Sequence, residues 1–178
     1  MKRSQLSIGL ILLLIFGCKV SSFTTIVAPS VSFENQKTFR LVDYSDQVNI
    51  TQPEYDNADN RQLINKSIID EMSDWGLTQN QAESDIIVTY TLFIRDMVDT
   101  RLDSAVIYKP WVDTKQDSFN YTEGAFTLIF MDDKTGNILA QSQLESVMDR
   151  DPKKFKSAIP RMIKKMFNRI EDEAKNGH

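Results

Sequence analysis

The strongest constraint on the fold is an alternating stretch in the middle of the chain, residues 86–98, which reads IIVTYTLFIRDMV. Successive side chains of an extended strand point to opposite faces. One face of this stretch is apolar or aromatic throughout, at Ile86, Val88, Tyr90, Leu92 and Ile94. The other face is mixed, at Ile87, Thr89, Thr91, Phe93 and Arg95. The pattern predicts a strand with one buried face, which needs both a sheet and a layer that covers it.

Three further strands are predicted, at residues 37–42, 125–131 and 138–144, because each run is rich in apolar or β-branched side chains. The last two flank the sequence DDKTGN, in which Gly136 allows the positive φ of a tight turn. These two strands should therefore form a hairpin.

A helix is predicted between the first two strands. Asp59 is the expected N-cap, and Gln62 would complete a capping box. Its apolar face consists of Ile64, Ile68, Met72 and Trp75. Gly76 should end the helix in the left-handed conformation, with Leu77 packing back against it.

A second helix is predicted to close the chain, beginning at Asp151 and Pro152. Its apolar stripe consists of Phe155, Ile159, Met162, Met166 and Ile170. Pro160 lies inside this pattern, so a kink or a break is expected there. The order of elements predicts an α+β fold, with an antiparallel sheet of about four to five strands and two helices packed on one face.

The start of the chain has the layout of a signal peptide. Lys2 and Arg3 precede an apolar run at residues 6–16, which is shorter than the roughly 20 residues that span a bilayer. The segment IFGC, residues 15–18, resembles a bacterial lipobox, which implies cleavage before Cys18 and acylation of that cysteine with fatty acids such as palmitate. The alternative is an ordinary signal peptide with a chance cysteine. Two or more acyl chains would hold the protein stably on a membrane.

This interpretation divides the chain into a lipoprotein signal peptide at residues 1–17, a lipidated cysteine and tether at 18–30, and one α+β domain at 31–178. Lys19 follows the cysteine in place of the Asp that retains some lipoproteins in the inner membrane. We therefore expect the outer membrane of a Gram-negative bacterium, with the domain facing the periplasm. The formal net charge of −4, which becomes more negative once Lys2 and Arg3 are removed, argues against a nucleic-acid partner.

The sequence contains few of the residues that proteins most often use for catalysis or metal binding. The only histidine is His178, the only cysteine is Cys18, and no Gly-rich phosphate loop is present. We therefore predict no catalytic residue, no metal site and no cofactor. The remaining candidates are carboxylates. Asp132 and Asp133 on the hairpin turn, and Asp43 and Asp46 near an acidic loop, could bind calcium through their oxygen atoms. A pair of carboxylates for hydrolysis is recognised only once the fold brings its two members together. The alternative role is turn formation and solvated charge.

Tyr108, Trp111 and Tyr121 are either surface aromatics of a binding loop or aromatics folded back over the core.

Basic residues are concentrated in the closing helix. They are Lys153, Lys154, Lys156, Arg161, Lys164, Lys165 and Arg169, and most gather away from the apolar stripe. They form either a solvated face, balanced by nearby acids, or a surface that lies against anionic lipid headgroups.

The order of these segments resembles the domain of unknown function family 4136, a family of bacterial lipoproteins. The resemblance rests on NQKTFRLV, DEMSDWGLTQNQAESDIIVTYTL and EGAFTLIFMDDKTGNILAQSQLE, followed by the closing helix. The family pattern falls on Thr38-Phe39, Gly76, Asp85-Ile86, Gly124 and residues 132–136. A tryptophan is common on the return strand of the hairpin, where this chain has Ala140. The resemblance implies the fold and the anchor but no reaction.

The sequence therefore leaves two alternative functions, which belong to different classes. The favoured one is a lipid-anchored envelope module with a non-enzymatic binding or structural role, whose protein partner the sequence does not identify. The alternative is a carboxylate-dependent hydrolase that acts on envelope glycan or lipid.

Overall fold

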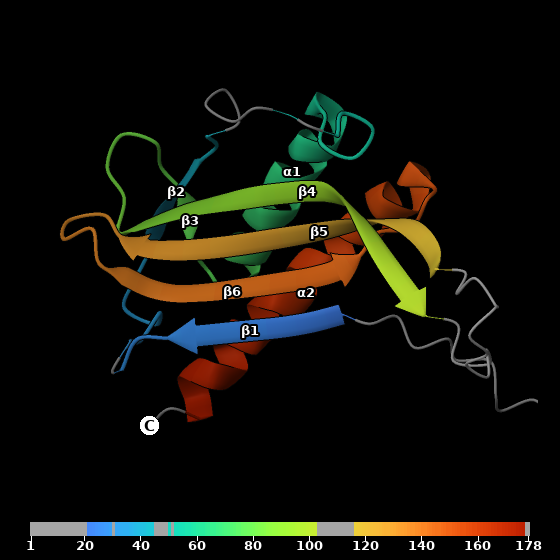
Figure 1. Ribbon diagram of the computed structural model, residues 1–178. Helices are drawn as coiled ribbons and strands as arrows, with labels where there is room; N and C mark the ends of the chain where they lie inside the picture. Colours follow the sequence, from blue (N-terminus) through green and yellow to red (C-terminus); the bar gives the residue numbers. More distant parts are fainter. Residues whose placement is uncertain (1–20, 30, 45–49, 51, 103–115, 177–178) are drawn as a thin grey trace, which may run out of the picture.

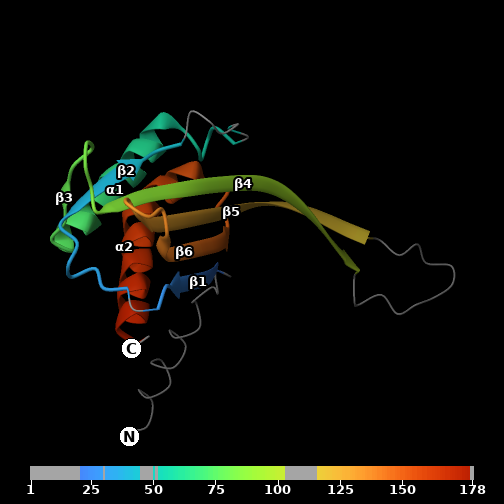
Figure 2. The same ribbon diagram turned by 90° about the vertical axis from the view of Figure 1, so that its left-hand side faces the viewer.

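The computed structural model describes residues 21–29, 31–44, 50, 52–102 and 116–176. In chain order, the elements are β1 (Ser21–Val27), β2 (Thr38–Val42), α1 (Ala58–Asp74), β3 (Thr78–Gln79), β4 (Ile86–Leu102), β5 (Gln116–Asp132), β6 (Ile138–Val147) and α2 (Pro152–Asn176). The strands form one six-stranded sheet in the order β1-β6-β5-β4-β2-β3. Both helices cover the same face of this sheet, and no helix among the described residues covers the other face (Figures 1 and 2).

The sheet is mixed, which corrects the expectation of a purely antiparallel sheet of four to five strands. β2 runs parallel to both β3 and β4, whereas the β4–β5, β5–β6 and β6–β1 pairs are antiparallel. The parallel pairing follows from the connection through α1, because a helical crossover returns the chain to the sheet in its original direction.

Strand β1 lies within residues 18–30, which the sequence analysis assigned to a tether. Ser21 pairs with Ser146 and Val27 with Ala140, so residues 21–27 belong to the sheet. Ala28 N–H donates to the Leu139 carbonyl at 2.9 Å, continuing the ladder. The domain thus begins earlier than residue 31.

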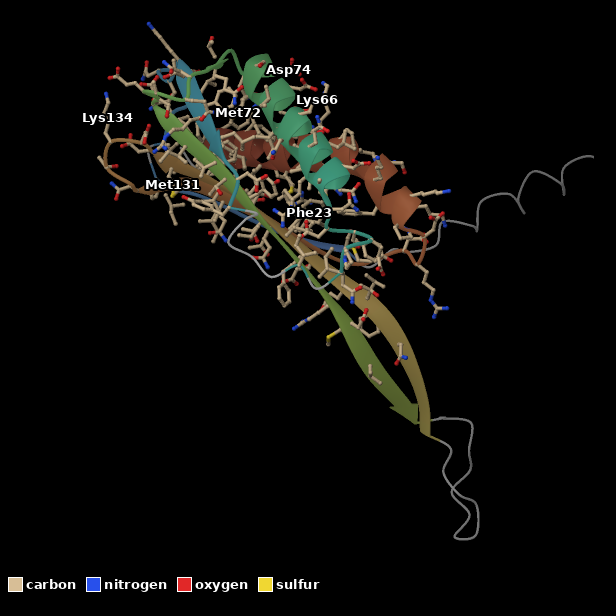
Figure 3. All side chains as sticks on the ribbon, turned by 90° about the horizontal axis from the view of Figure 1, so that it is seen from above. Phe23, Lys66, Met72, Asp74, Met131 and Lys134 are labelled. Atoms are coloured by element: carbon tan, nitrogen blue, oxygen red, sulfur yellow. The ribbon has the colours of Figure 1, made fainter. Side chains whose placement is uncertain are left out.

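The core lies between the sheet and the two helices. All five residues of the predicted inner face of β4 are buried, and Ile64, Ile68 and Met72 of α1 are fully buried against them. Figure 3 shows this layer from above, with the β4–β5 hairpin extending beyond the body at the end opposite Lys134. Trp75 is only partly buried, although it packs against the core.

Both helix ends of α1 are defined by local hydrogen bonds. The N-cap is Asn57, whose side chain accepts from the Asn60 N–H, so the predicted cap at Asp59 is wrong. At the other end, Leu77 N–H donates to the Met72 carbonyl at 3.0 Å and Gly76 adopts φ +84°. This is a Schellman motif, as predicted.

Helix α2 continues through Pro160, so the expected break is absent. The side chain of Pro160 is exposed, which leaves the carbonyl one turn earlier accessible to water. The buried stripe includes Ile163 and Phe167 in addition to Ile159, Met166 and Ile170. Phe155 and Met162 are partly buried.

Candidate functional site

Part of the family pattern, namely Thr38, Asp85 and the turn at residues 132–136, lies at one end of the sheet, where β2 and β4 begin, whereas Gly124 pairs with Ile94 further along β5. The Asp85 carboxylate accepts hydrogen bonds from Lys37 N–H at 2.9 Å, Thr38 N–H at 3.0 Å and Thr38 Oγ1 at 3.1 Å. These hydrogen bonds lower the pKa of Asp85, and the bond from the Lys37 backbone N–H contributes most. Asp85 therefore holds the starts of two parallel strands together.

The carboxylates on the hairpin turn are bonded at the same end. Asp133 accepts from Arg40 Nη2 at 2.6 Å, Arg40 Nε at 3.1 Å and Ser84 Oγ at 2.6 Å. The Arg40 hydrogen bonds are the main cause of its pKa falling from 3.8 to about 2. Asp132 accepts from the Thr135 N–H and Oγ1, both at 2.7 Å, which stabilises the turn. Asp133 thus connects the turn to β2 and to the residue before Asp85, whereas Asp132 stabilises the turn itself.

A second polar cluster lies between α1, β4 and the end of β2. Arg61 is buried and donates to Asp56 through Nε and Nη2, at 2.5 Å and 2.6 Å, and to Asp43 through Nη1 at 3.3 Å. Asp43 also accepts from Asn65 Nδ2 and from the Tyr90 hydroxyl, both at 3.2 Å. Burial raises the pKa of Tyr90 well above its ordinary value. Because Arg61 lies between the two carboxylates, this cluster links helix to sheet.

A cluster of aromatic rings lies near the C-terminal ends of both helices. Trp75 contacts Phe33, Phe130 and Phe167 at ring-centroid distances of 5.2, 5.8 and 4.9 Å. A depression of about 410 Å³ opens beside it and is lined by Val31, Ser32, Phe33, Glu34, Asp74, Trp75, Glu171, Ala174 and Lys175. Glu171 accepts from Lys175 Nζ at 2.6 Å.

This aromatic depression, as we call it, has an apolar wall and an acidic rim. Aromatic rings beside carboxylates suit a ligand with hydroxyl or ammonium groups. The sequence analysis missed it because Phe33, Trp75 and Glu171 come from three separate elements.

Several sequence candidates fall outside the described residues: Cys18, Asp46, Tyr108, Trp111 and His178. Tyr121 is described and partly buried on β5, where it pairs with Met97 of β4. In the described part of the chain, no group of three or more His, Cys, Asp or Glu residues is placed to hold a metal ion. No helix among those residues is both long and apolar enough to cross a membrane.

The fold defines an α+β protein with a mixed, open sheet and two helices on one face. The chain belongs to the family described as domain of unknown function DUF4136, whose model matches residues 24–170. No curated protein matches the chain.

Several solved structures resemble this one at low sequence identity. A PDZ domain protein from Parabacteroides distasonis gives a TM-score of 0.46 at 19% identity, and the match covers 81% of this chain but only 35% of that one. The PelC dodecamer from Paraburkholderia phytofirmans gives 0.42 at 8% identity, covering 81% and 95%. A homolog of a neuraminyllactose-binding hemagglutinin from Helicobacter pylori gives 0.40 at 11% identity, covering 81% and 92%. At these TM-scores the likenesses carry no information about function.

Proposed function

We propose that this protein is a lipoprotein anchored through Cys18 at the outer membrane, facing the periplasm, where it acts as a non-enzymatic binding or structural module. The observation that carries the non-enzymatic role is the use of the candidate carboxylates. Asp43 and Asp133 bond to arginines of neighbouring elements, and Asp132 bonds to Thr135 within its own turn, so all three contribute to the fold. A hydrolase of the kind expected from the sequence needs two carboxyl groups facing a substrate across a cleft.

The anchor is supported by the position of β1. Cys18 precedes Ser21 by three residues, and three residues span at most about 11 Å. Ser21 pairs with Ser146 near the end of β6, whereas the aromatic depression adjoins the C-terminal ends of both helices, near the other end of β1. An anchored domain would therefore hold its aromatic depression away from the attachment point.

One observation supports the alternative function, a carboxylate-dependent hydrolase. Glu34, Asp74 and Glu171 line the aromatic depression and are the carboxylates best placed to meet a ligand there. The pairing of Glu171 with Lys175 and the exposure of Glu34 and Asp74 to solvent favour binding over acid–base chemistry.

The test of the anchor is mass spectrometry of the mature protein, combined with fractionation of the cell envelope. We expect an N-terminal peptide that starts at Cys18 and carries fatty acyl chains, in the outer-membrane fraction. Cys18→Ser should abolish the acylation and release the protein or leave it as precursor. An unmodified N-terminus beyond Cys18 would contradict the anchor, and co-fractionation with inner-membrane markers would contradict the location.

A further inference from the structure

Apart from Lys153 and from Lys154 and Lys175, which pair with Asp149 and Glu171, the basic residues of α2 form two groups. On the α1 side, Lys156 Nζ lies 3.2 Å from the Asp59 carboxylate. Burial raises the pKa of Glu71 on α1, and the nearby Lys164 ammonium group offsets part of that rise. The charges on this side are therefore accompanied by acids.

In the second group, Lys165 and Arg169 face β1, and Arg161 lies one turn before Lys165 on the same side of the helix. Arg161, Lys165 and Arg169 are exposed and follow one another at intervals of four residues, so they form one ridge along the helix. Lys165 Nζ lies 4.3 Å and Arg169 Cζ 4.5 Å from the centre of the Phe23 ring. These cation–π contacts place the ridge beside the edge strand of the sheet.

The ridge has no ion pair within the described part of the chain, where no carboxylate approaches any of its three cations within 4.0 Å. Glu173 lies one turn beyond Arg169 but does not pair with it. Glu145, on β6 near Ser21, bonds to Ser22 and Gln143. The ridge is thus a concentrated positive surface on an acidic protein.

The edge of β1 adds hydrogen-bond donors to the same surface. Because Ala28 N–H points toward β6, the alternation of an antiparallel ladder directs the N–H groups of Ile26 and Thr24 the same way. The N–H groups of Phe23, Thr25 and Val27 are then directed outward, along the free edge. Positive charge and free backbone donors together suit phosphate oxygens.

We propose that Arg161, Lys165 and Arg169, together with the outer edge of β1, form the membrane-facing surface of the anchored protein and bind anionic lipid headgroups. This inference rests on the proposed anchor at Cys18, which lies within about 11 Å of Ser21 along the chain. That reach is comparable to the Debye length of about 8–10 Å at physiological salt. Each cation near an anionic membrane surface increases the equilibrium constant for contact with that surface by about fivefold at moderate salt.

The test uses the full lipidated protein, reconstituted in vesicles of phosphatidylcholine alone or with one third phosphatidylglycerol. Lysines are labelled briefly with an amine-reactive reagent and quantified by mass spectrometry. On the anionic vesicles, we expect labelling of Lys165 to be at least about fivefold slower than on neutral vesicles. Lys66, which is exposed on α1, should react equally on both. High salt should remove the protection.

Two variants separate the ridge from the rest of the helix. Arg161→Gln combined with Arg169→Gln should abolish the protection of Lys165, whereas the matched change Lys164→Gln on the α1 side should leave it intact. Equal labelling of Lys165 on both vesicles, with the protein still bound to them, would overturn the ridge proposal but leave the anchor standing. Loss of vesicle binding altogether would instead contradict the anchor. If Lys165 were protected in native envelope fragments but not on anionic vesicles, the ridge would bind a protein partner, and the lipid proposal would be overturned.

Discussion

At the scale of single residues, three aspartates, two of which the sequence analysis named as candidates for calcium, connect separate segments of the fold. Asp85 joins the starts of β2 and β4, Asp133 joins the hairpin turn to Arg40 on β2, and Asp43 meets Arg61 from α1. Hydrogen bonds in which one partner is charged are stronger than those between neutral groups. The family pattern at Thr38, Asp85 and Asp132 is thus explained by strand and turn geometry.

The lowered pKa of Asp133 predicts that the stability of the folded protein depends on pH in the acidic range. This pKa is lowered from 3.8 to about 2 in the folded protein, so the folded state binds the proton more weakly than the unfolded state. The Arg40–Asp133 pair should therefore stabilise the protein fully above pH 3.8 and lose this contribution as the pH falls toward 2.

Asp133→Asn should be less stable than the native protein at neutral pH, and the difference should shrink through this acidic range. Urea unfolding at a series of pH values measures it. The control is Asp70→Asn, which removes only an exposed pair with Lys66. A difference between Asp133→Asn and the native protein that stays constant from pH 6 to pH 2 would show that Asp133 is not stabilised as an anion.

At the scale of elements, β1 pairs with β6 on one side and with no other strand in the described part of the chain. Thr24 N–H is directed toward β6, whereas Thr25 N–H is directed outward and the Thr25 hydroxyl lies 3.1 Å from Ser142 Oγ. Proline is tolerated on edge strands where its missing N–H would face solvent.

Thr24→Pro should therefore destabilise the domain by about 1–3 kcal/mol, because it removes a ladder hydrogen bond. Thr25→Pro, one residue further, should cost clearly less, since it removes only the hydroxyl contact. Chemical denaturation of both variants gives the comparison. Equal losses, or a larger loss for Thr25→Pro, would show that β1 pairs in another register or that its edge is covered.

At the scale of the whole molecule, the sheet has one face packed under two helices and one face open. Two neighbouring residues on β4 report these environments, because Leu92 is 8% exposed and Phe93 is 58% exposed. Leu92→Ala should destabilise by about 2–5 kcal/mol, the range for truncation in a packed core. Phe93→Ala should cost less than about 1 kcal/mol, despite removing a larger side chain.

Thermal and denaturant unfolding of the two variants test this asymmetry. A large loss for Phe93→Ala would mean that something covers the open face, such as another part of the chain or a second molecule.

Much of the fold could be predicted from sequence because the signals were local. The alternation of residues 86–98, the glycine at the end of α1 and the DDKTGN turn depend on contacts within a few residues. Prediction failed for β1 and for the length of β5. SSFTTIV is short and half polar, and the first half of β5 is polar as well. Nothing local distinguishes them from loops until they pair with β6 and β4.

The sequence by itself determined the α+β class, the inner face of β4 and both helix faces in outline, because side-chain periodicity follows directly from backbone geometry. Its apolar start and Cys18 also indicate an anchor, which remains a prediction. Only the tertiary structure decided the parallel placement of β2, the inclusion of β1, the structural use of the carboxylates and the separation of the α2 cations. Each depends on which residues, distant in sequence, meet across elements, and such pairing leaves no periodic trace in the chain.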